Sequence, residues 1–326
     1  MPRTNLTIYA GSRPVVGFDA LQNLADVRLV TEPGDLPAAL DGAEILYLWD
    51  YFADGLRTAW PAADALRWIH VPAAGVDKLL FPELAASDVT VTNARGIFDQ
   101  AMAEYALTGI LHFTKNIPQA LRNQQDRRWE YFRTGNLAGT RALIAGTGSI
   151  GRTTARMLRA VGITADGLGR TARPGYADFG AVHASTDFAA VAGNYDYIVL
   201  AAPLTDATRG MLSADVLAAM RPTAVLVNMG RGQLVDQAAL TDALQNQAIA
   251  GAVLDVTHPE PLPASNPLWT LENVLITPHL SGDSQTHLPA MAAQFEDNLR
   301  RYLAGQPLVN VVDKRLGFVP SSGQPA

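Results

Sequence analysis

Short apolar segments alternate with longer helix-like segments along most of the chain, which is typical of a parallel sheet with helices on both faces. In the first part of the chain, apolar segments predict strands at Leu6–Ala10, Val27–Val30, Ile45–Trp49, Trp68–Val71 and Val89–Thr92. Further strands are predicted at Arg141–Gly146, Ile163–Gly169, Tyr197–Pro203, Ala224–Gly230, Ile249–Val256 and Val274–Pro278. The pattern therefore predicts an α/β fold.

Several longer segments predict helices. Ala101–Thr114 is apolar on all sides, which indicates a buried helix. The polar segment Gln119–Glu130 predicts another helix directly after it, and Gln285–Ala304 predicts a late one. With 326 residues, the chain is about twice as long as a typical domain. We therefore expect two domains, with a nucleotide-binding unit inserted in the middle of another α/β unit.

Composition narrows the possible functions. Hydrophobic residues make up 48% and charged residues 17% of the chain, as in an ordinary globular protein. The formal net charge of −6 argues against a nucleic-acid partner, because phosphate backbones are bound by clustered Lys and Arg. The chain contains no cysteine, which excludes disulfides and thiolate chemistry. No signal-peptide pattern and no 18-residue apolar stretch is present, so we expect a cytoplasmic protein without a membrane partner.

A glycine pattern lies between a predicted strand and a predicted helix. Gly146, Gly148 and Gly151 form G-x-G-x-x-G, with Ser149 and Ile150 between the last two glycines. In a dinucleotide site, the first glycine makes the tight turn, the second lets the backbone approach the pyrophosphate, and the third allows close helix–strand packing. A purely structural turn is the alternative. The strand–turn–helix context favours dinucleotide binding.

The end of the next strand indicates which dinucleotide is bound. An NAD site has an Asp or Glu there for the ribose 2′-hydroxyl, but this strand ends at Gly169 and is followed by Arg170, Thr171, Ala172 and Arg173. Asp166 comes too early and should lie within the strand. Two arginines can pair with a 2′-phosphate, so we expect NADP(H). NAD(H), with both arginines solvated, remains the alternative.

The motifs that follow the glycine pattern resemble those of the D-isomer-specific 2-hydroxyacid dehydrogenase family. They are AAPLTDATRGML (201–212), VLVNMGRGQLVD (225–236), GAVLDVTHPEPLP (251–263) and NVLITPHLSG (273–282). Upstream, VPAAGVDKLL (71–80) and VTNARGIFDQAMAEYAL (90–106) resemble the substrate loop and interdomain helix of the family. The resemblance extends from about residue 68 to residue 302, whereas residues 1–67 match only loosely.

The resemblance implies a catalytic trio. Arg231 would bind the substrate carboxylate and polarise the 2-oxo group. His279 would protonate the alkoxide during reduction and act as base during oxidation. Glu260 would pair with His279 and fix its tautomer. An ordinary surface charge is the alternative for Arg231, and a solvated loop residue the alternative for Glu260.

The same resemblance implies binding roles for further residues. The substrate would contact Ala74, Gly75 and Val76, whose backbone N–H groups form an anion-binding loop. Asp255 would hold the nicotinamide carboxamide, and Met102 would approach the nicotinamide, with core packing as an equal alternative for Met102. The remaining predicted cofactor contacts are Pro203, Thr208, Met229, Arg231, His279 and Gly282.

Departures from particular relatives narrow the substrate. Formate dehydrogenases carry Gln where this chain has Glu260, phosphite dehydrogenases carry Lys at the place of Ala74, and phosphoglycerate dehydrogenases carry a basic residue at the place of Val71. The motifs look closest to the glyoxylate/hydroxypyruvate reductase branch. The aromatic residues after a predicted strand, Trp49, Tyr51 and Phe52, could line a pocket for a longer side chain or pack in the core.

We therefore expect two doubly wound parallel-sheet domains with a cleft between them. A flavodoxin-like substrate domain would comprise 1–97 and 285–326, and a Rossmann-like dinucleotide domain 98–284. The expected reaction is NADPH-dependent reduction of a small 2-oxo acid to a D-2-hydroxy acid, without a metal. The alternatives are a strictly NAD-dependent enzyme and a dinucleotide-sensing, corepressor-like protein. By resemblance, Ile117–Asn136 would reach a second copy in a homodimer, with Trp129 in the interface or on its own surface.

Overall fold

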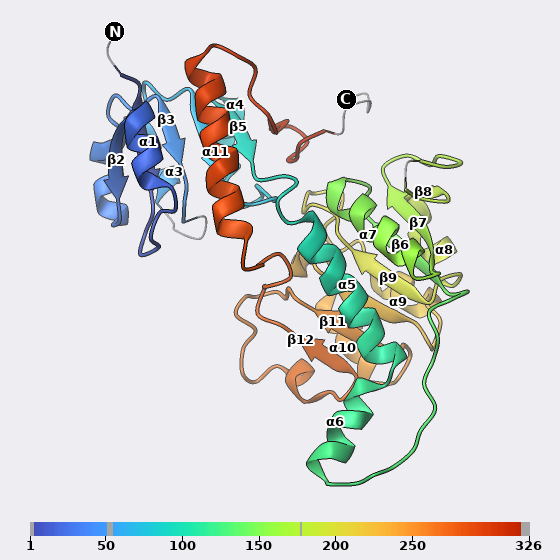
Figure 1. Cartoon of the computed structure of the whole chain (residues 1–326). Helices are drawn as coiled ribbons and strands as arrows, with labels where there is room; N and C mark the ends of the chain where they lie inside the picture. Colours follow the sequence, from blue (N-terminus) through green and yellow to red (C-terminus); the bar gives the residue numbers. More distant parts are fainter. Residues whose placement is uncertain (1–2, 51–54, 177, 321–326) are drawn as a thin grey trace. The chain divides into compact units, whose positions relative to one another are not determined.

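The computed structural model describes residues 3–50, 55–176 and 178–320. The chain divides into two compact units: the first comprises Met1–Phe98 and Ser284–Ala326, and the second comprises Asp99–Asp283. The chain thus leaves the first unit, completes the second, and returns to the first (Figure 1).

The first unit is built on a five-stranded parallel sheet of strand order β2-β1-β3-β4-β5. The strands are β1 (Asn5–Tyr9), β2 (Asp26–Val30), β3 (Ile45–Tyr47), β4 (Trp68–Val71) and β5 (Thr90–Asn93). The helices are α1 (Phe18–Leu24), α2 (Leu36–Leu40), α3 (Leu56–Ala59), α4 (Pro82–Ala86) and α11 (His287–Leu303). This strand order is that of flavodoxin-like folds.

Alternating residues of this sheet supply two separate cores. Leu6 and Ile8 of β1 are buried on the face covered by α1 and α11, whereas Tyr9 is buried on the face covered by α2, α3 and α4. Successive side chains of a strand point to opposite faces, so helices on both sides require strands that are apolar throughout. The helix α11 returns from the far end of the sequence to cover one of these faces (Figure 1).

The core under α11 encloses a group of aromatic residues around His70. His70 lies between Tyr47, Trp68 and Phe295, with ring centroids 5.3–6.2 Å from its own. Its Nδ1 is 2.8 Å from Thr92 Oγ1, which also accepts a hydrogen bond from Trp68 Nε1. Neither His70 Nε2 nor Tyr47 Oη has a hydrogen-bond partner within the described part of the chain. Burial lowers the pKa of the His70 imidazole to about 3.

The second unit contains a seven-stranded parallel sheet of order β12-β11-β10-β9-β6-β7-β8. Its strands are β6 (Arg141–Ala145), β7 (Thr164–Gly169), β8 (Val182–Ala184), β9 (Tyr197–Leu200), β10 (Val225–Asn228), β11 (Gly251–Leu254) and β12 (Val274–Ile276). Counted from β6, the order is that of the Rossmann fold with one strand added. The order reverses between β6 and β9, the place where such sheets bind nucleotides.

Helices cover both faces of this sheet. The helices are α5 (Asp99–Thr114), α6 (Ile117–Gln125), α7 (Ser149–Ala160), α8 (Phe188–Ala192), α9 (Ala214–Ala219) and α10 (Gln237–Gln245). One face is covered by α8, α9 and α10, and α5 packs beside α7. At Gly109, a Cβ atom would lie 2.9 Å from a methyl group of Val253, so the absence of a side chain lets α5 approach the sheet closely.

The structure differs from the expectation in one helix end and in one additional strand. The helix expected at Gln119–Glu130 ends at Gln125, because Arg127 has a left-handed conformation with φ 55°. The amide of Arg128 then bonds to the carbonyl of Asn123, which closes the helix C-terminus in a Schellman motif with Arg in place of the usual Gly. The short strand β8 was not expected, because its sequence Val-His-Ala is not a continuous apolar segment.

Within the described residues, no helix is both long and apolar enough to span a membrane. The same residues contain no group of three or more His, Cys, Asp or Glu side chains that could hold a metal ion.

Candidate active site

The glycine loop between β6 and α7 has the geometry that a dinucleotide site requires. Gly146 has φ 111°, and a Cβ there would lie 2.6 Å from the carbonyl oxygen of Ala201, at the end of β9. A Cβ at Gly151 would lie 1.8 Å from the carbonyl oxygen of Gly146, so only glycine allows the helix to start this close to the strand. Gly148 instead faces open space, with no atom within 4 Å of a Cβ. The backbone at Gly148 is therefore accessible to a phosphate at the start of α7, where Ser149 and Ile150 follow.

The end of β7 provides no carboxylate for a ribose. Asp166 is the third residue of the strand and is 5% exposed. Its carboxylate accepts hydrogen bonds from Arg141 Nη2, Tyr195 Oη and the amide of Ala181. The strand ends at Gly169, and the side chains of Arg170 and Thr171 that follow it are exposed. Asp166 is thus committed to a structural network, as its place within the strand predicts.

The three residues of the expected catalytic trio follow three neighbouring strands. Arg231 comes after β10, Glu260 after β11 and His279 after β12, and these strands pair in register. The carboxyl ends of parallel strands meet at one edge of a sheet, so the trio lies along the same edge as the glycine loop. The three residues therefore share one edge of the sheet although they are far apart in the sequence.

His279 and Glu260 form a direct pair. The distance from His279 Nδ1 to Glu260 Oε2 is 3.0 Å, and about a third of each side chain is exposed. Glu260 Oε1 accepts a hydrogen bond from the amide of Thr257, which orients the carboxylate. Because the carboxylate accepts at Nδ1, Nδ1 carries a proton, and Nε2 is left to exchange a proton with a substrate.

The loop that carries Arg231 is held by Asn228, which sequence reasoning did not single out. Asn228 is 1% exposed, its Oδ1 accepts from the amide of Gly230, and its Nδ2 donates to the carbonyl of Arg231. The Arg231 side chain donates from Nη1 to the carbonyl of Gly230. A signal was present in the sequence, since a polar residue ends an otherwise apolar strand.

Asp255 fixes the loop that carries His279. Its Oδ1 accepts from the amide of Leu280 and the hydroxyl of Thr277, and its Oδ2 accepts from the amide of Ser281. The carbonyl of Asp255 accepts from the amide of His279, whose backbone is left-handed with φ 54°. Asp255 is 2% exposed. These bonds show a positioning role, and the expected contact with a carboxamide remains a prediction.

In the first unit, the loop after β4 contains Ala74, Gly75 and Val76. The Val76 side chain is buried in the core, so this residue can offer a ligand only its backbone. Asn93, at the end of β5, donates from Nδ2 to the carbonyl of Ala74 at 2.6 Å and thereby holds the loop. Asn93 is a second positioning residue that the sequence analysis did not single out.

Of the three aromatic residues expected to follow β3 toward the site, the structure describes only Trp49. Trp49 is 3% exposed, packs in the core under α11 and donates from Nε1 to the carbonyl of Pro14. The core alternative is therefore correct for Trp49. Tyr51 and Phe52 lie outside the described residues.

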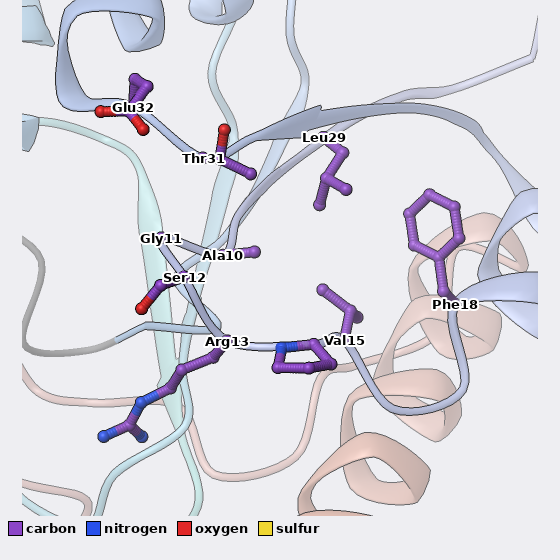
Figure 2. A pocket seen from close by; sticks show the side chains of 10 residues that line it. Ala10, Gly11, Ser12, Arg13, Val15, Phe18, Leu29, Thr31 and Glu32 are labelled. Carbon is purple, nitrogen blue, oxygen red and sulfur yellow. The ribbon is translucent and has the colours of Figure 1, made fainter.

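A groove of about 700 Å³ opens between the loops after β1 and β2 (Figure 2). Val15, Phe18 and Leu29 line one end of it, and Ser12, Thr31 and Glu32 are among its other lining residues. The Arg13 side chain is directed away from the hollow and is 3.9 Å from Asp50. No residue of the expected site lines the groove, so it does not bear on the expected reaction.

The remaining expected cofactor contacts also lie in the second unit. Thr208 Oγ1 donates to the carbonyl of Pro203 and so closes the turn after β9. Met229 follows β10 and is buried, and Gly282 follows the His279 loop. Met102 in α5 is buried. No geometry tests their contacts with a cofactor, which stay predictions.

Comparisons with known proteins agree with this geometry. A family model described as D-isomer specific 2-hydroxyacid dehydrogenase, NAD binding domain, matches residues 107–281. The chain is 33% identical to the human glyoxylate reductase/hydroxypyruvate reductase over 250 residues, which cover 74% of this chain and 76% of the human protein. This chain belongs to the D-isomer-specific 2-hydroxyacid dehydrogenase family.

Solved structures of this family have the same fold. A D-isomer specific 2-hydroxyacid dehydrogenase from Xanthobacter autotrophicus Py2, in complex with NADPH and MES, aligns with a TM-score of 0.83 and 29% identity over 97% of this chain and 100% of that one. An NADPH-dependent glyoxylate/hydroxypyruvate reductase from Sinorhizobium meliloti, in complex with NADP and malonate, aligns with a TM-score of 0.81 and 27% identity over 98% and 99%.

Proposed function

We propose that this protein reduces a small 2-oxo acid to a D-2-hydroxy acid with NADPH. The observation that carries the proposal is the His279–Glu260 pair, 3.0 Å apart, on the same sheet edge as Arg231 and the glycine loop. The glycine loop fits a dinucleotide, because Gly148 leaves the backbone open while Gly146 and Gly151 permit the tight turn. Bound NADPH supplies the hydride that reduces C2 of the substrate.

The side chains of the trio supply the remaining chemistry. The Arg231 guanidinium binds the substrate carboxylate and withdraws electron density from the 2-oxo oxygen. His279 donates a proton from Nε2 to that oxygen as the alcohol forms. The Glu260 carboxylate stabilises the protonated imidazole and keeps its ring in place. In oxidation, the same nitrogen accepts the proton.

The cofactor preference is part of the proposal. Arg170 and Arg173 follow β7 where an NAD site has a carboxylate, and the nearby Asp166 is bonded to Arg141 and Tyr195. Relatives crystallised with NADPH and NADP support the same choice. Glyoxylate, hydroxypyruvate and longer 2-oxo acids are the candidate substrates, bound through the loop Ala74–Val76.

A steady-state screen of these 2-oxo acids with NADPH and with NADH tests the proposal. We expect NADPH to be preferred, and Arg170→Ala to lower the preference about ten- to a hundredfold, since a charge-assisted phosphate contact contributes about 1.5–3 kcal/mol. Equal kcat/KM for the two cofactors would refute the NADPH preference. NADPH binding without turnover of any 2-oxo acid would instead indicate a dinucleotide sensor.

We also propose that the protein acts as a homodimer. The arm Ile117–Asn136 runs along the outside of the second unit (Figure 1). It carries fully exposed Trp129 and largely exposed Tyr131, so Trp129 does not pack on its own subunit. Large exposed aromatic side chains are typical of interfaces.

A further inference from the structure

The segment that leaves β7 and returns as β8 forms a hairpin from Arg173 to Val182, described except at residue 177. The amide of Arg173 donates to the carbonyl of Val182, and the amide of Val182 donates to the carbonyl of Arg173. Nearer the tip, the amide of Phe179 bonds to the carbonyl of Tyr176 and closes a turn. Two of its residues, Arg173 and Tyr176, also contact each other: the Arg173 guanidinium lies 4.5 Å from the centroid of the Tyr176 ring.

Asp178 ties the tip of this hairpin to α7. Its Oδ2 is 2.9 Å from Arg152 Nε and 2.9 Å from Arg156 Nη1. Its carbonyl oxygen accepts a hydrogen bond from Arg159 Nη1, also at 2.9 Å. The three arginines are spaced four and three residues apart, so they lie on one face of the helix. Only 16% of the Asp178 side chain is exposed, which makes this a partly buried, multiply bonded clamp rather than a surface ion pair.

The base of the hairpin is held by a different carboxylate. Asp166 Oδ1 accepts from the amide of Ala181, and Phe179 is 4% exposed against the sheet. The hairpin is thus fixed at both ends. The tip is fixed to α7, and the first turn of α7 follows the glycine loop. The glycine loop and the hairpin are therefore both attached to the same helix.

We propose that Asp178 is a positioning residue for cofactor selection: it holds the turn that keeps Tyr176 under Arg173 and so fixes the guanidinium for a ribose 2′-phosphate. The inference rests on the proposed NADPH preference. The strength of a phosphate contact depends on the position of the guanidinium that makes it. A guanidinium that is already stacked on an aromatic ring loses less conformational entropy on binding than a mobile one. Asp178 itself does not touch the cofactor.

Two variants with opposite charge changes separate positioning from long-range electrostatics. Asp178→Asn removes a negative charge and weakens both carboxylate bonds of the clamp, whereas Arg156→Gln removes a positive charge and one of these bonds, so both loosen the clamp. If position matters, both weaken 2′-phosphate recognition. If only the net charge matters, Asp178→Asn strengthens it while Arg156→Gln weakens it.

The matched control is Glu296→Gln. Glu296 is also bonded to an arginine, with its Oε1 2.6 Å from Arg300 Nη2, and its side chain is 30% exposed. It belongs to α11 in the first unit, whereas the hairpin and α7 belong to the second. We expect Glu296→Gln to leave cofactor selectivity unchanged.

Calorimetric titration with 2′,5′-ADP and with 5′-AMP gives the readout, since the two probes differ only in the 2′-phosphate and need no turnover. We expect both clamp variants to lower the ratio of affinities by about three- to tenfold, with 5′-AMP affinity and kcat at saturating NADPH nearly unchanged. The double variant should resemble Asp178→Asn alone, because Arg156 acts on the turn through the Asp178 carboxylate.

The outcomes are distinguishable. The inference alone would be overturned if both variants kept the ratio of affinities for 2′,5′-ADP and 5′-AMP of the unmodified protein. Changes of this ratio in opposite directions in the two variants would overturn it as well. No preference in the unmodified protein would refute the NADPH proposal and this inference with it. Should Asp178→Asn fail to fold, Arg156→Gln carries the test, because that side chain is half exposed and its loss perturbs packing less.

Discussion

His279 combines the proposed proton donor with an unusual backbone. A residue other than glycine in the left-handed region costs about 1 kcal/mol, and such residues persist where surrounding bonds hold them. Here the bonds come from Asp255, which binds the amides of His279, Leu280 and Ser281 through its carbonyl and carboxylate oxygens. The left-handed backbone of His279 is thus held in the conformation in which the imidazole pairs with Glu260.

His279→Ala should abolish most of the activity and leave the fold intact. The alanine cannot donate a proton, and a positioned general acid contributes about 10²–10⁴-fold to the rate. We expect kcat to fall by this factor while the Kd for NADPH, measured by fluorescence titration, changes little. A variant that keeps normal kcat would remove His279 from the mechanism.

Glu260→Gln tests the partner of His279. The amide keeps an acceptor for the amide of Thr257 but carries no charge to stabilise the protonated imidazole. Without that charge the imidazole is held less firmly in the orientation and tautomer that the proposed proton transfer needs, so kcat for 2-oxo acid reduction should fall while the Kd for NADPH changes little. An unchanged kcat would contradict the pairing.

At the scale of elements, the sequence allowed both sheets to be predicted because nearly every strand is a short apolar segment followed by a turn. It could not show β8, where His183 interrupts the apolar residues, or the end of α6, where Arg127 takes the place usually held by glycine. In the site, Arg231, Glu260 and His279 were accessible through their motifs. The role of Asn93 was not, because the loop at Ala74 becomes its neighbour only after folding. Asn228 was missed although it bonds residues only two and three positions further along the chain, where a polar residue at the end of an apolar strand was the available signal.

The buried His70, set between β3, β4, β5 and α11, predicts acid sensitivity. Its pKa is about 3 in the folded protein and near 6.5 when unfolded, so below about pH 6.5 only the unfolded chain takes up the proton. The free energy of unfolding therefore carries no penalty from His70 above about pH 6.5, and it falls by about 1.4 kcal/mol per pH unit as the pH is lowered from there toward 3.

Urea unfolding at several pH values should show this slope. His70→Phe should reduce it by about one proton, whereas Tyr47→Phe, in the same cluster, should keep it; equal slopes in both variants would exclude His70 as the source.

For the molecule as a whole, the exposed apolar side chains of the arm Ile117–Asn136 support the proposed dimer. Ile117 and Leu121 of α6 are 40% and 49% exposed, and Trp129 and Tyr131 follow them in the sequence. Such a series of apolar side chains on one segment is costly in water unless another surface covers it.

Light scattering at micromolar concentration should therefore report about twice the mass of one chain. Trp129→Ser combined with Tyr131→Ser should weaken the dimer by about 2 kcal/mol or more, because central aromatic residues dominate interface energies. Leu29→Ser is the control, because Leu29 lies in the first unit and is as exposed as Leu121 of the arm. We expect this variant to leave the mass unchanged. A fully active monomer would refute the dimer and any role of Trp129 in it.

The return of the chain to its first unit has a consequence for synthesis on the ribosome. The second unit is continuous in sequence and can fold as soon as residue 283 has emerged. The five-stranded sheet is complete by residue 93, yet α1 covers only part of one face until Phe295 and Leu299 of α11 arrive. At about 5–20 residues per second, that delay of about 200 residues lasts roughly 10–40 s. During translation, the apolar face around Trp68 and Tyr47 therefore stays incompletely covered for that time.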